Sequence, residues 1–161
     1  MPLDIQLKQT NFLAYSDLAR DFGQKFGMKA IGGPVRLALY VSSSAVDTNF
    51  TGKLVDVWPN GFAQNLTDGI LRARYRNSME KAEYMNPGAV YKLTIDLWST
   101  SNVFLAGHKL RIEIASSNFP RFDRNLNTGG NPESGTRMVK ANNVVYHDRD
   151  RASVLSVPIV P

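Results

Sequence analysis

Residues 100–130 read TSNVFLAGHKLRIEIASSNFPRFDRNLNTGG and combine a clear strand with a long irregular segment. After a turn at residues 106–108, apolar and charged side chains alternate over residues 109–114, which is the period-two pattern of a half-buried strand. The pattern breaks at residues 116–125, where aromatics, charges and a proline follow no repeat. An irregular segment that follows directly on a strand is either a binding loop or a packed corner, and both alternatives are open at this point.

The same alternation recurs along the chain, with turn signals every ~8–12 residues. The further strands predicted in this way cover residues 35–41, 50–58, 62–66, 70–76, 90–98, 143–147 and 153–160. Residues 59–61, Pro-Asn-Gly, and residues 67–69, Thr-Asp-Gly, predict tight turns, because proline presets φ and Asn-Gly or Asp-Gly accepts positive φ. Many short strands with almost no helical periodicity predict an all-β fold, a jelly-roll β-sandwich.

The first part of the chain carries a weaker signal. We expect residues 1–31 to form a lead-in segment and residues 32–161 to form the sandwich domain. Within the lead-in segment, residues 11–15 are compatible with a short strand, and residues 16–22 predict a short helix with Ser16 as its N-cap. This segment is either an arm that packs on a partner or a lead-in strand with an insertion.

Composition bounds the class of protein. The 161 residues fit one domain with a core of its own. The absence of cysteine excludes disulfides, thiolate nucleophiles and Cys-ligated metals, and it suggests a reducing, cytoplasmic location. The net charge of +5 is scattered among acids, so we expect no nucleic-acid partner. With no long apolar run and no leader pattern, we expect no membrane partner and no signal peptide.

The sequence shows no catalytic apparatus. A Gly-x-Ser-x-Gly nucleophile motif is absent, and so are a phosphate-cradling glycine loop and metal-ligand spacing, so no catalytic residue, cofactor or metal is predicted. The two histidines have plain interpretations. His108 lies at a strand turn and is predicted to be a hydrogen-bonded structural residue, and His147 precedes a charged turn at residues 148–151.

Three arginines, Arg72, Arg74 and Arg76, alternate with less polar residues over the predicted strand at residues 70–76. Period-two spacing places them on one side of that strand. They form either a solvated, salt-bridged outer face or a surface for an anionic ligand or partner.

Several separate motifs, in a consistent order, resemble one known family. They are GPV at residues 33–35, LYVSSSAVDT at 39–48, KLVDVWPNG at 53–61, DGILRARYR at 68–76, IDLWSTSNVF at 95–104, GH at 107–108, SSNFPRFDRN at 116–125, VYHD at 145–148 and LSVPI at 155–159. Together they resemble the C-terminal, non-catalytic domain of X-Pro dipeptidyl-peptidases and cocaine-esterase-type (CocE/NonD) hydrolases. The chain departs from the family at residues 17–31, which are more basic and richer in glycine than the usual linker.

The resemblance implies a galactose-binding-domain-like jelly roll that packs on an α/β-hydrolase domain and shapes its substrate entrance. In that family the partner domain carries the Ser-Asp-His triad, so dipeptidyl-peptidase or ester hydrolase activity would reside in a domain that this chain lacks. The expected partner is an α/β-hydrolase domain in the same or a separate chain. A domain without that partner would expose apolar surface, so a homo-oligomer is also expected.

Three hypotheses about function follow. The first is a non-catalytic accessory domain, in which the irregular segment is a structural corner or interface. Its predicted residues are Phe119, Arg121, Phe122, Asp123, Arg124 and Asn125. Arg121, Asp123 and Arg124 are expected to form salt bridges that hold the rings of Phe119 and Phe122 at the edge of the core. The second is a stand-alone carbohydrate- or ligand-binding module, and the third is an autonomous hydrolase.

The binding-module hypothesis needs exposed aromatic rings beside polar groups. Its candidate residues are Tyr40, Trp58 and Trp98. The alternative for each of the three is packing in the core.

Overall fold

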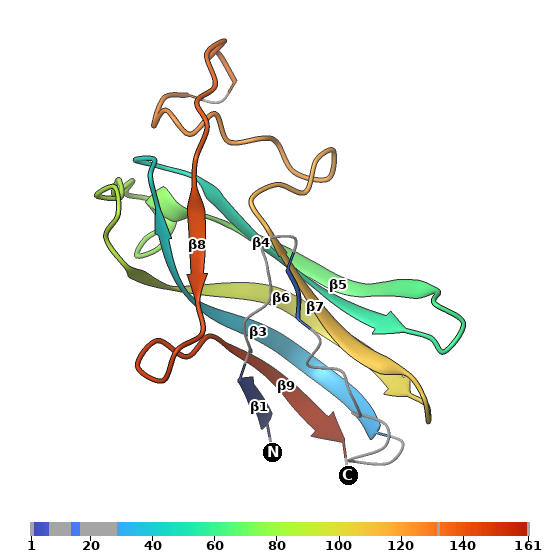
Figure 1. Cartoon of the computed structure of the whole chain (residues 1–161). Helices are drawn as coiled ribbons and strands as arrows, with labels where there is room; N and C mark the ends of the chain where they lie inside the picture. The colour runs from blue at the N-terminus through green and yellow to red at the C-terminus, as the bar shows by residue number, and fades with distance from the viewer. Residues whose placement is uncertain (1, 7–13, 17–28, 132, 161) are drawn as a thin grey trace.

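The computed structural model describes residues 2–6, 14–16, 29–131 and 133–160, which form two antiparallel β-sheets packed face to face (Figure 1). The first sheet has the order β1 (Pro2–Gln6), β9 (Val154–Val160), β3 (Lys29–Ser43) and β6 (Tyr91–Phe104), and β8 (Asn143–Tyr146) also pairs with β3. The second sheet has the order β2 (Ala14–Ser16), β7 (Lys109–Ala115), β4 (Asn49–Val57) and β5 (Ala63–Arg72). The all-β sandwich predicted from the sequence is confirmed.

The core lies between the two sheets and is made by the inward side chains of alternate strand residues. Its buried members are Ile31, Val35, Leu37, Leu39, Val41, Phe50, Leu54, Leu93, Ile95, Leu97, Phe104, Leu110, Ile112, Leu155 and Val157. The alternation predicted for residues 35–41 and 91–97 is thus confirmed: odd-numbered residues face the core, with Tyr91 at its margin.

A β-bulge interrupts the pairing of β3 with β6. Pro34 lies opposite Ser99 but Arg36 lies opposite Asp96, so β6 carries one extra residue at this point. Trp98 occupies the bulge with a φ of 65°. The extra residue reverses the alternation, so that the odd-numbered Leu97 is buried before the bulge and the even-numbered Phe104 is buried after it.

The turn predicted at residues 67–69 is wrong. These residues lie inside β5, which replaces the two predicted strands at 62–66 and 70–76 by a single one. Gly69 does not form a turn but allows the backbone of β5 to approach that of β6 closely. A Cβ added at this position would lie 2.0 Å from the backbone oxygen of Asp96 on β6. At the same place Thr67 donates a hydrogen bond from its hydroxyl to the backbone oxygen of Leu97. The edge strand β5 of the second sheet therefore packs directly on the edge strand β6 of the first.

The prediction of three arginines on one outward face is also wrong. β5 ends at Arg72, and a 3₁₀ turn, η1 (Ala73–Tyr75), follows it. The period of three in such a turn breaks the period of two, so both Ala73 and Arg74 become buried.

Two strands come from the predicted lead-in segment. β1 pairs with β9, and β2 pairs with β7, so this segment adds one strand to each sheet. The helix predicted over residues 16–22 lies outside the described residues, apart from Ser16 at the end of β2. No helix in the described residues is long and apolar enough to cross a membrane.

Candidate functional site

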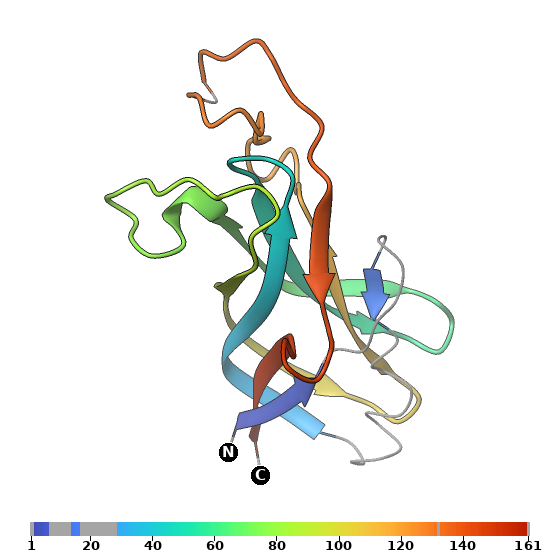
Figure 2. The same ribbon diagram turned by 60° about the vertical axis from the view of Figure 1, so that its left-hand side comes forward.

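Three loops lie close together at one end of the sandwich, and we call them the loop end (Figures 1 and 2). It is formed by residues 43–49, 73–90, 116–131 and 133–142. Backbone hydrogen bonds join the first two loops: the amide of Ala73 donates to the oxygen of Thr48 at 2.9 Å, and the amide of Met85 donates to that of Val46 at 2.8 Å.

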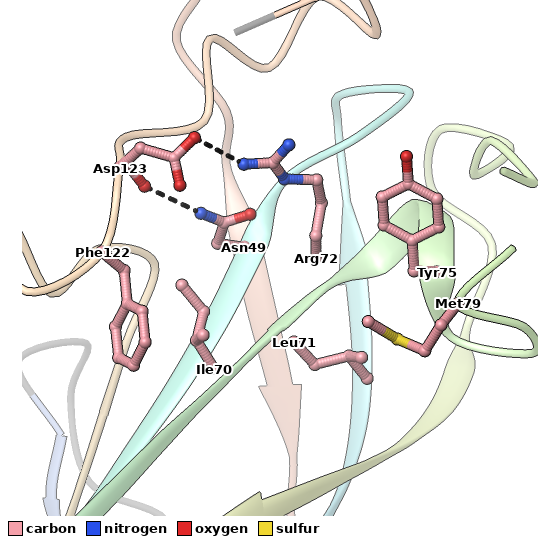
Figure 3. Close-up of a pocket in the computed structure, with 8 residues that line it drawn as sticks. All are labelled: Asn49, Ile70, Leu71, Arg72, Tyr75, Met79, Phe122 and Asp123. Atoms are coloured by element: carbon pink, nitrogen blue, oxygen red, sulfur yellow. Dashed lines mark hydrogen bonds and ion pairs between the residues drawn. The ribbon is translucent and has the colours of Figure 1, made fainter. Parts of the chain in front are cut away.

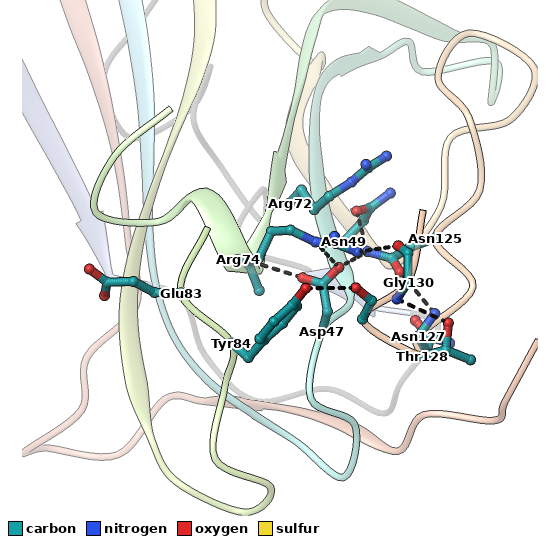
Figure 4. Close-up of polar contacts among 12 residues, drawn as sticks. Asp47, Asn49, Arg72, Arg74, Glu83, Tyr84, Asn125, Asn127, Thr128 and Gly130 are labelled. Atoms are coloured by element: carbon teal, nitrogen blue, oxygen red, sulfur yellow. Dashed lines mark hydrogen bonds and ion pairs between the residues drawn. The ribbon is translucent and has the colours of Figure 1, made fainter. Parts of the chain in front are cut away.

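A buried ion pair holds the three loops together (Figure 4). Asp47 is 0% exposed, and its carboxylate accepts hydrogen bonds from the backbone amide of Arg74 at 2.9 Å and from its Nε at 2.8 Å. The same carboxylate accepts from Nδ2 of Asn125 at 2.8 Å, and Nη2 of Arg74 donates to the oxygen of Gly130 at 3.0 Å. We call Asp47, Arg74, Asn125 and Gly130 the loop-end network.

Further bonds extend the loop-end network along the third loop. The side-chain oxygen of Asn125 accepts from the amide of Asn127 at 2.8 Å, and Nδ2 of Asn127 donates to the oxygen of Val139 at 2.9 Å. The hydroxyl of Tyr84 donates to the oxygen of Gly129 at 2.8 Å. The long segment after β7 is therefore bound to the sandwich at several points.

An apolar hollow of about 250 Å³ opens beside the loop-end network (Figure 3). Its lining residues are Asn49, Ile70, Leu71, Arg72, Tyr75, Met79, Phe122 and Asp123. On its rim Nη2 of Arg72 lies 2.8 Å from the carboxylate of Asp123, and Nδ2 of Asn49 donates to the backbone oxygen of Asp123 at 3.5 Å. Met79 is 77% exposed, so a large apolar side chain faces solvent at this hollow.

The predicted corner residues are dispersed over the loop end. Asn125 is buried in the loop-end network, and Phe122 is half-buried in the wall of the hollow. Phe119 is 63% exposed, and the guanidinium of Arg124 lies 5.1 Å from the centre of its ring. Phe119 is thus not held at the core edge as the sequence predicted.

The predicted ion pairs inside the corner are replaced by pairs to β5. Asp123 pairs with Arg72, and Nε of Arg121 lies 2.8 Å from the carboxylate of Asp68. The pattern of residues 116–125 alone could not show this, because both partners lie about fifty residues earlier in the chain.

The Arg72–Asp123 pair is expected to contribute little to stability. Asp123 is 64% exposed, and exposed ion pairs are screened by water and cost side-chain entropy. Asp123→Ala is expected to lower the free energy of unfolding by no more than about 1 kcal/mol. Urea denaturation measures it, and a loss well above that value would show that Asp123 has the structural role first predicted from the sequence.

The three candidate ligand aromatics occupy different places in the structure. Tyr40 on β3 is half-buried, with Nζ of Lys92 at 5.7 Å from its ring centre. Trp58 lies at the turn after β4 and contacts Phe62 edge to face, with ring centres 5.4 Å apart. Trp98 is 68% exposed in the β6 bulge. They therefore do not form one aromatic platform.

His108 is hydrogen-bonded, as predicted. Its Nδ1 lies 2.9 Å from both carboxylate oxygens of Asp56, and both side chains are buried. The ring of Trp58 covers the imidazole, with ring centres 5.2 Å apart. The pair ties the end of β4 to the start of β7. Within residues 2–6, 14–16, 29–131 and 133–160, no group of three or more His, Cys, Asp or Glu side chains could hold a metal ion.

Burial lowers the pKa of His147 below its usual value of 6.5, and the negative charge of Asp148 opposes the effect only in part. Nδ1 of His147 is buried and has no hydrogen-bond partner among the described residues. The fold therefore favours the neutral imidazole. Because the unfolded chain takes up this proton more readily, the stabilisation is present above pH 6.5 and is lost as the pH falls from there toward the lower folded-state pKa.

This linkage predicts a measurable pH effect. Between about pH 7.5 and about pH 5.5, the free energy of unfolding should fall more for the native protein than for His147→Gln, because glutamine does not titrate. Urea denaturation at both pH values measures the two differences. Equal differences would mean that His147 titrates alike in the folded and unfolded chains.

Sequence reasoning missed the residues that organise the loop end. The sequence patterns assigned no role to Asp47 and predicted that Arg74 faces outward. The available signal was an aspartate, an arginine and an asparagine, one in each of the motifs at residues 39–48, 68–76 and 116–125. These three residues are the side-chain members of the loop-end network.

Strand order and two-sheet packing place the chain among antiparallel jelly-roll domains. Residues 30–156 match the family described as the X-Pro dipeptidyl-peptidase C-terminal non-catalytic domain, and the chain belongs to that family. The resemblance stated from the sequence motifs is thereby confirmed.

Known relatives are much longer than this chain. It is 46% identical over 132 residues to the cocaine esterase of Rhodococcus sp. (strain MB1 Bresler), a match that covers 81% of this chain and 23% of the esterase. Among solved structures, an aminopeptidase from a marine sediment Thaumarchaeota archaeon superposes with a TM-score of 0.75 and 29% identity, over 83% of this chain and 24% of that one. An α-amino acid ester hydrolase shares the fold, with a TM-score of 0.79 and 23% identity over 88% of this chain and 27% of its own.

Proposed function

We propose that this chain is an accessory domain that packs on an α/β-hydrolase domain of a serine hydrolase and shapes its substrate entrance. The family match over residues 30–156 carries the proposal, because that family is described as non-catalytic. The hydrolase activity then belongs to the partner domain, in the same or a separate chain. A cytoplasmic location and the division into a lead-in segment, residues 1–31, and a sandwich domain, residues 32–161, are part of this proposal.

The loop end is the face that we assign to this contact. Its exposed large apolar residues are Val46, Met79, Tyr84, Val90, Phe119 and Met138. An apolar patch of this kind, with a polar rim formed by Arg72 and Asp123, has the composition of a protein interface. The loop-end network holds the three loops that carry this apolar patch, so the patch is already ordered before a partner binds.

A chimera tests the proposal. In the Rhodococcus cocaine esterase, residues 30–156 of this chain replace the matching segment, and the chimera is expected to keep its ester hydrolysis. Met79→Asp places a charge in the contact and should shorten the half-life of activity on heating, while leaving the melting temperature of the isolated domain unchanged.

Phe62→Asp is the matched control, because Phe62 is exposed at the β4–β5 turn, away from the loop end. It should leave the chimera as stable as the unsubstituted one. If Met79→Asp and Phe62→Asp behave alike in the chimera, the loop end is not the contact face. An unsubstituted chimera without activity would contradict the accessory role itself.

Self-association is a separate expectation that follows from the exposed apolar residues. Light scattering of the isolated domain across a range of concentrations measures it, and a constant monomer mass would contradict it.

A further inference from the structure

Trp98 has an unusual backbone conformation for its size. Its φ of 65° lies in the left-handed region, which bulky residues rarely occupy because Cβ approaches the following carbonyl oxygen. The amide of Trp98 donates to the carboxylate of Asp96 at 2.8 Å, which holds the bulge in place. The side chain is 68% exposed, so burial of the ring does not offset this strain. Strained positions of this kind cluster at functional sites.

A hollow of about 290 Å³ lies beside the ring, and none of its lining residues belongs to the loop-end network. Its lining residues are Asn65, Leu66, Thr67, Asp68, Trp98 and Arg121. Nε of Arg121 pairs with one carboxylate oxygen of Asp68 at 2.8 Å, and Nδ2 of Asn118 donates to the other at 2.9 Å. Asp68 is buried and fixed by these two partners, so the polar wall of the hollow is held in one arrangement before any ligand arrives.

From this arrangement we infer that the hollow beside Trp98 binds a pyranose sugar residue. A flat, exposed indole offers an apolar face to the C–H groups on one side of a pyranose ring. The amide of Asn65 and the guanidinium of Arg121, whose side chain is 60% exposed, offer hydrogen bonds to the hydroxyl groups at the ring edge. Leu97, the preceding residue, is buried in the core, so the alternation of the strand directs the ring of Trp98 outward.

Charge in the hollow favours a neutral or singly acidic sugar over a strongly charged ligand. The charges of the Asp68 carboxylate and the Arg121 guanidinium cancel, while the remaining N–H groups of Arg121 can donate to a sugar carboxylate as readily as to hydroxyl groups. Neutral glycans and uronates both contain the pyranose ring that the site would recognise. The experiment therefore tests the two kinds of ligand separately.

Tryptophan fluorescence of the whole chain tests this site. The protein has two tryptophans, so the variant Trp58→Phe leaves Trp98 as the only indole reporter. Cellohexaose and galactohexaose form the neutral arm, and trigalacturonate forms the acidic arm. We expect a saturable blue shift of Trp98 emission in at least one arm, with an affinity of about millimolar or tighter. No saturable change in either arm would overturn the inference.

Trp98→Gly separates a binding role from a packing role. Isothermal titration calorimetry measures the affinity of the Trp98→Gly variant for the sugar. The variant should bind the sugar at least about tenfold more weakly than the native protein, because the stacking surface is lost. Its melting temperature should be unchanged or higher, because glycine adopts a φ of 65° without strain. Unchanged binding, or a marked fall in melting temperature, would overturn the inference.

Asn65→Ala and Phe62→Ala complete the experiment. Asn65 is exposed, so its replacement should weaken binding about threefold to tenfold, as expected for one lost hydrogen bond. Phe62 is an exposed aromatic residue that does not line this hollow, and its replacement should leave binding unchanged. Equal losses for the two variants would show that binding is not located at Trp98.

Discussion

Gly69→Ala is expected to lower the free energy of unfolding by about 3 kcal/mol, at the upper end for an overpacked site. The added methyl group would lie 2.0 Å from the backbone oxygen of Asp96 and 3.2 Å from Cδ2 of Leu97. Because the nearest obstacle is backbone and not the end of a flexible side chain, relief requires β5 to move away from β6. Such a movement would also disturb the hydrogen bond from Thr67 to the oxygen of Leu97.

Thermal and urea denaturation of Gly69→Ala measure the effect, with Gly130→Ala as the matched control. Gly130 is exposed, and a Cβ there would meet only the hydroxyl of Thr128 at 3.4 Å. The control should therefore unfold like the native protein. A loss below about 1 kcal/mol for Gly69→Ala would mean that the two edge strands are not packed as closely as described.

Asp47→Ala is expected to lower the free energy of unfolding by about 3–5 kcal/mol, because it leaves a buried guanidinium without its partner. The side chain of Arg74 is only 9% exposed, so water cannot replace the lost carboxylate. Asn125 loses an acceptor at the same time. All three loops of the loop end depend on this carboxylate, so the damage should extend beyond one contact.

Asp123→Ala is the matched control for Asp47→Ala, since both aspartates lie 2.8 Å from an arginine nitrogen and differ in exposure. Urea denaturation measures both, and amide hydrogen exchange shows where the structure opens. We expect faster exchange for the amides of Ala73 and Met85 in Asp47→Ala alone. Similar losses of stability for the two variants would contradict the importance of burial for this pair.

Local patterns in the sequence were sufficient to predict most of the strands from residue 35 onward, but not β1 or the continuous β5. Alternation of apolar and polar residues follows directly from the pleat, so the inward positions of Leu37, Leu93 and Ile95 could be read from the chain. The same reasoning failed at Gly69. Glycine serves both turns and close backbone contacts, and a single sequence does not distinguish the two uses.

The candidate site was predicted less well, because its contacts join residues that are far apart in the chain. Asn125 was among the predicted corner residues, but its acceptor Asp47 lies 78 residues away. The burial of Arg74 depends on a 3₁₀ turn that has no distinctive composition. Trp98 was named as a candidate aromatic, but its left-handed backbone conformation belongs to a bulge that appears only when β3 and β6 are paired.

The long strand β3 has a consequence for how the chain folds during synthesis. One edge of β3 pairs with β6, and the other pairs with β8 and β9. That second edge stays unpaired until residues 143–160 have left the ribosome, so a nascent chain carries an open strand edge while residues 44–142 are being synthesised. Ribosome-bound chains ending before residue 143 should therefore recruit chaperones, and release from them should coincide with the emergence of β9.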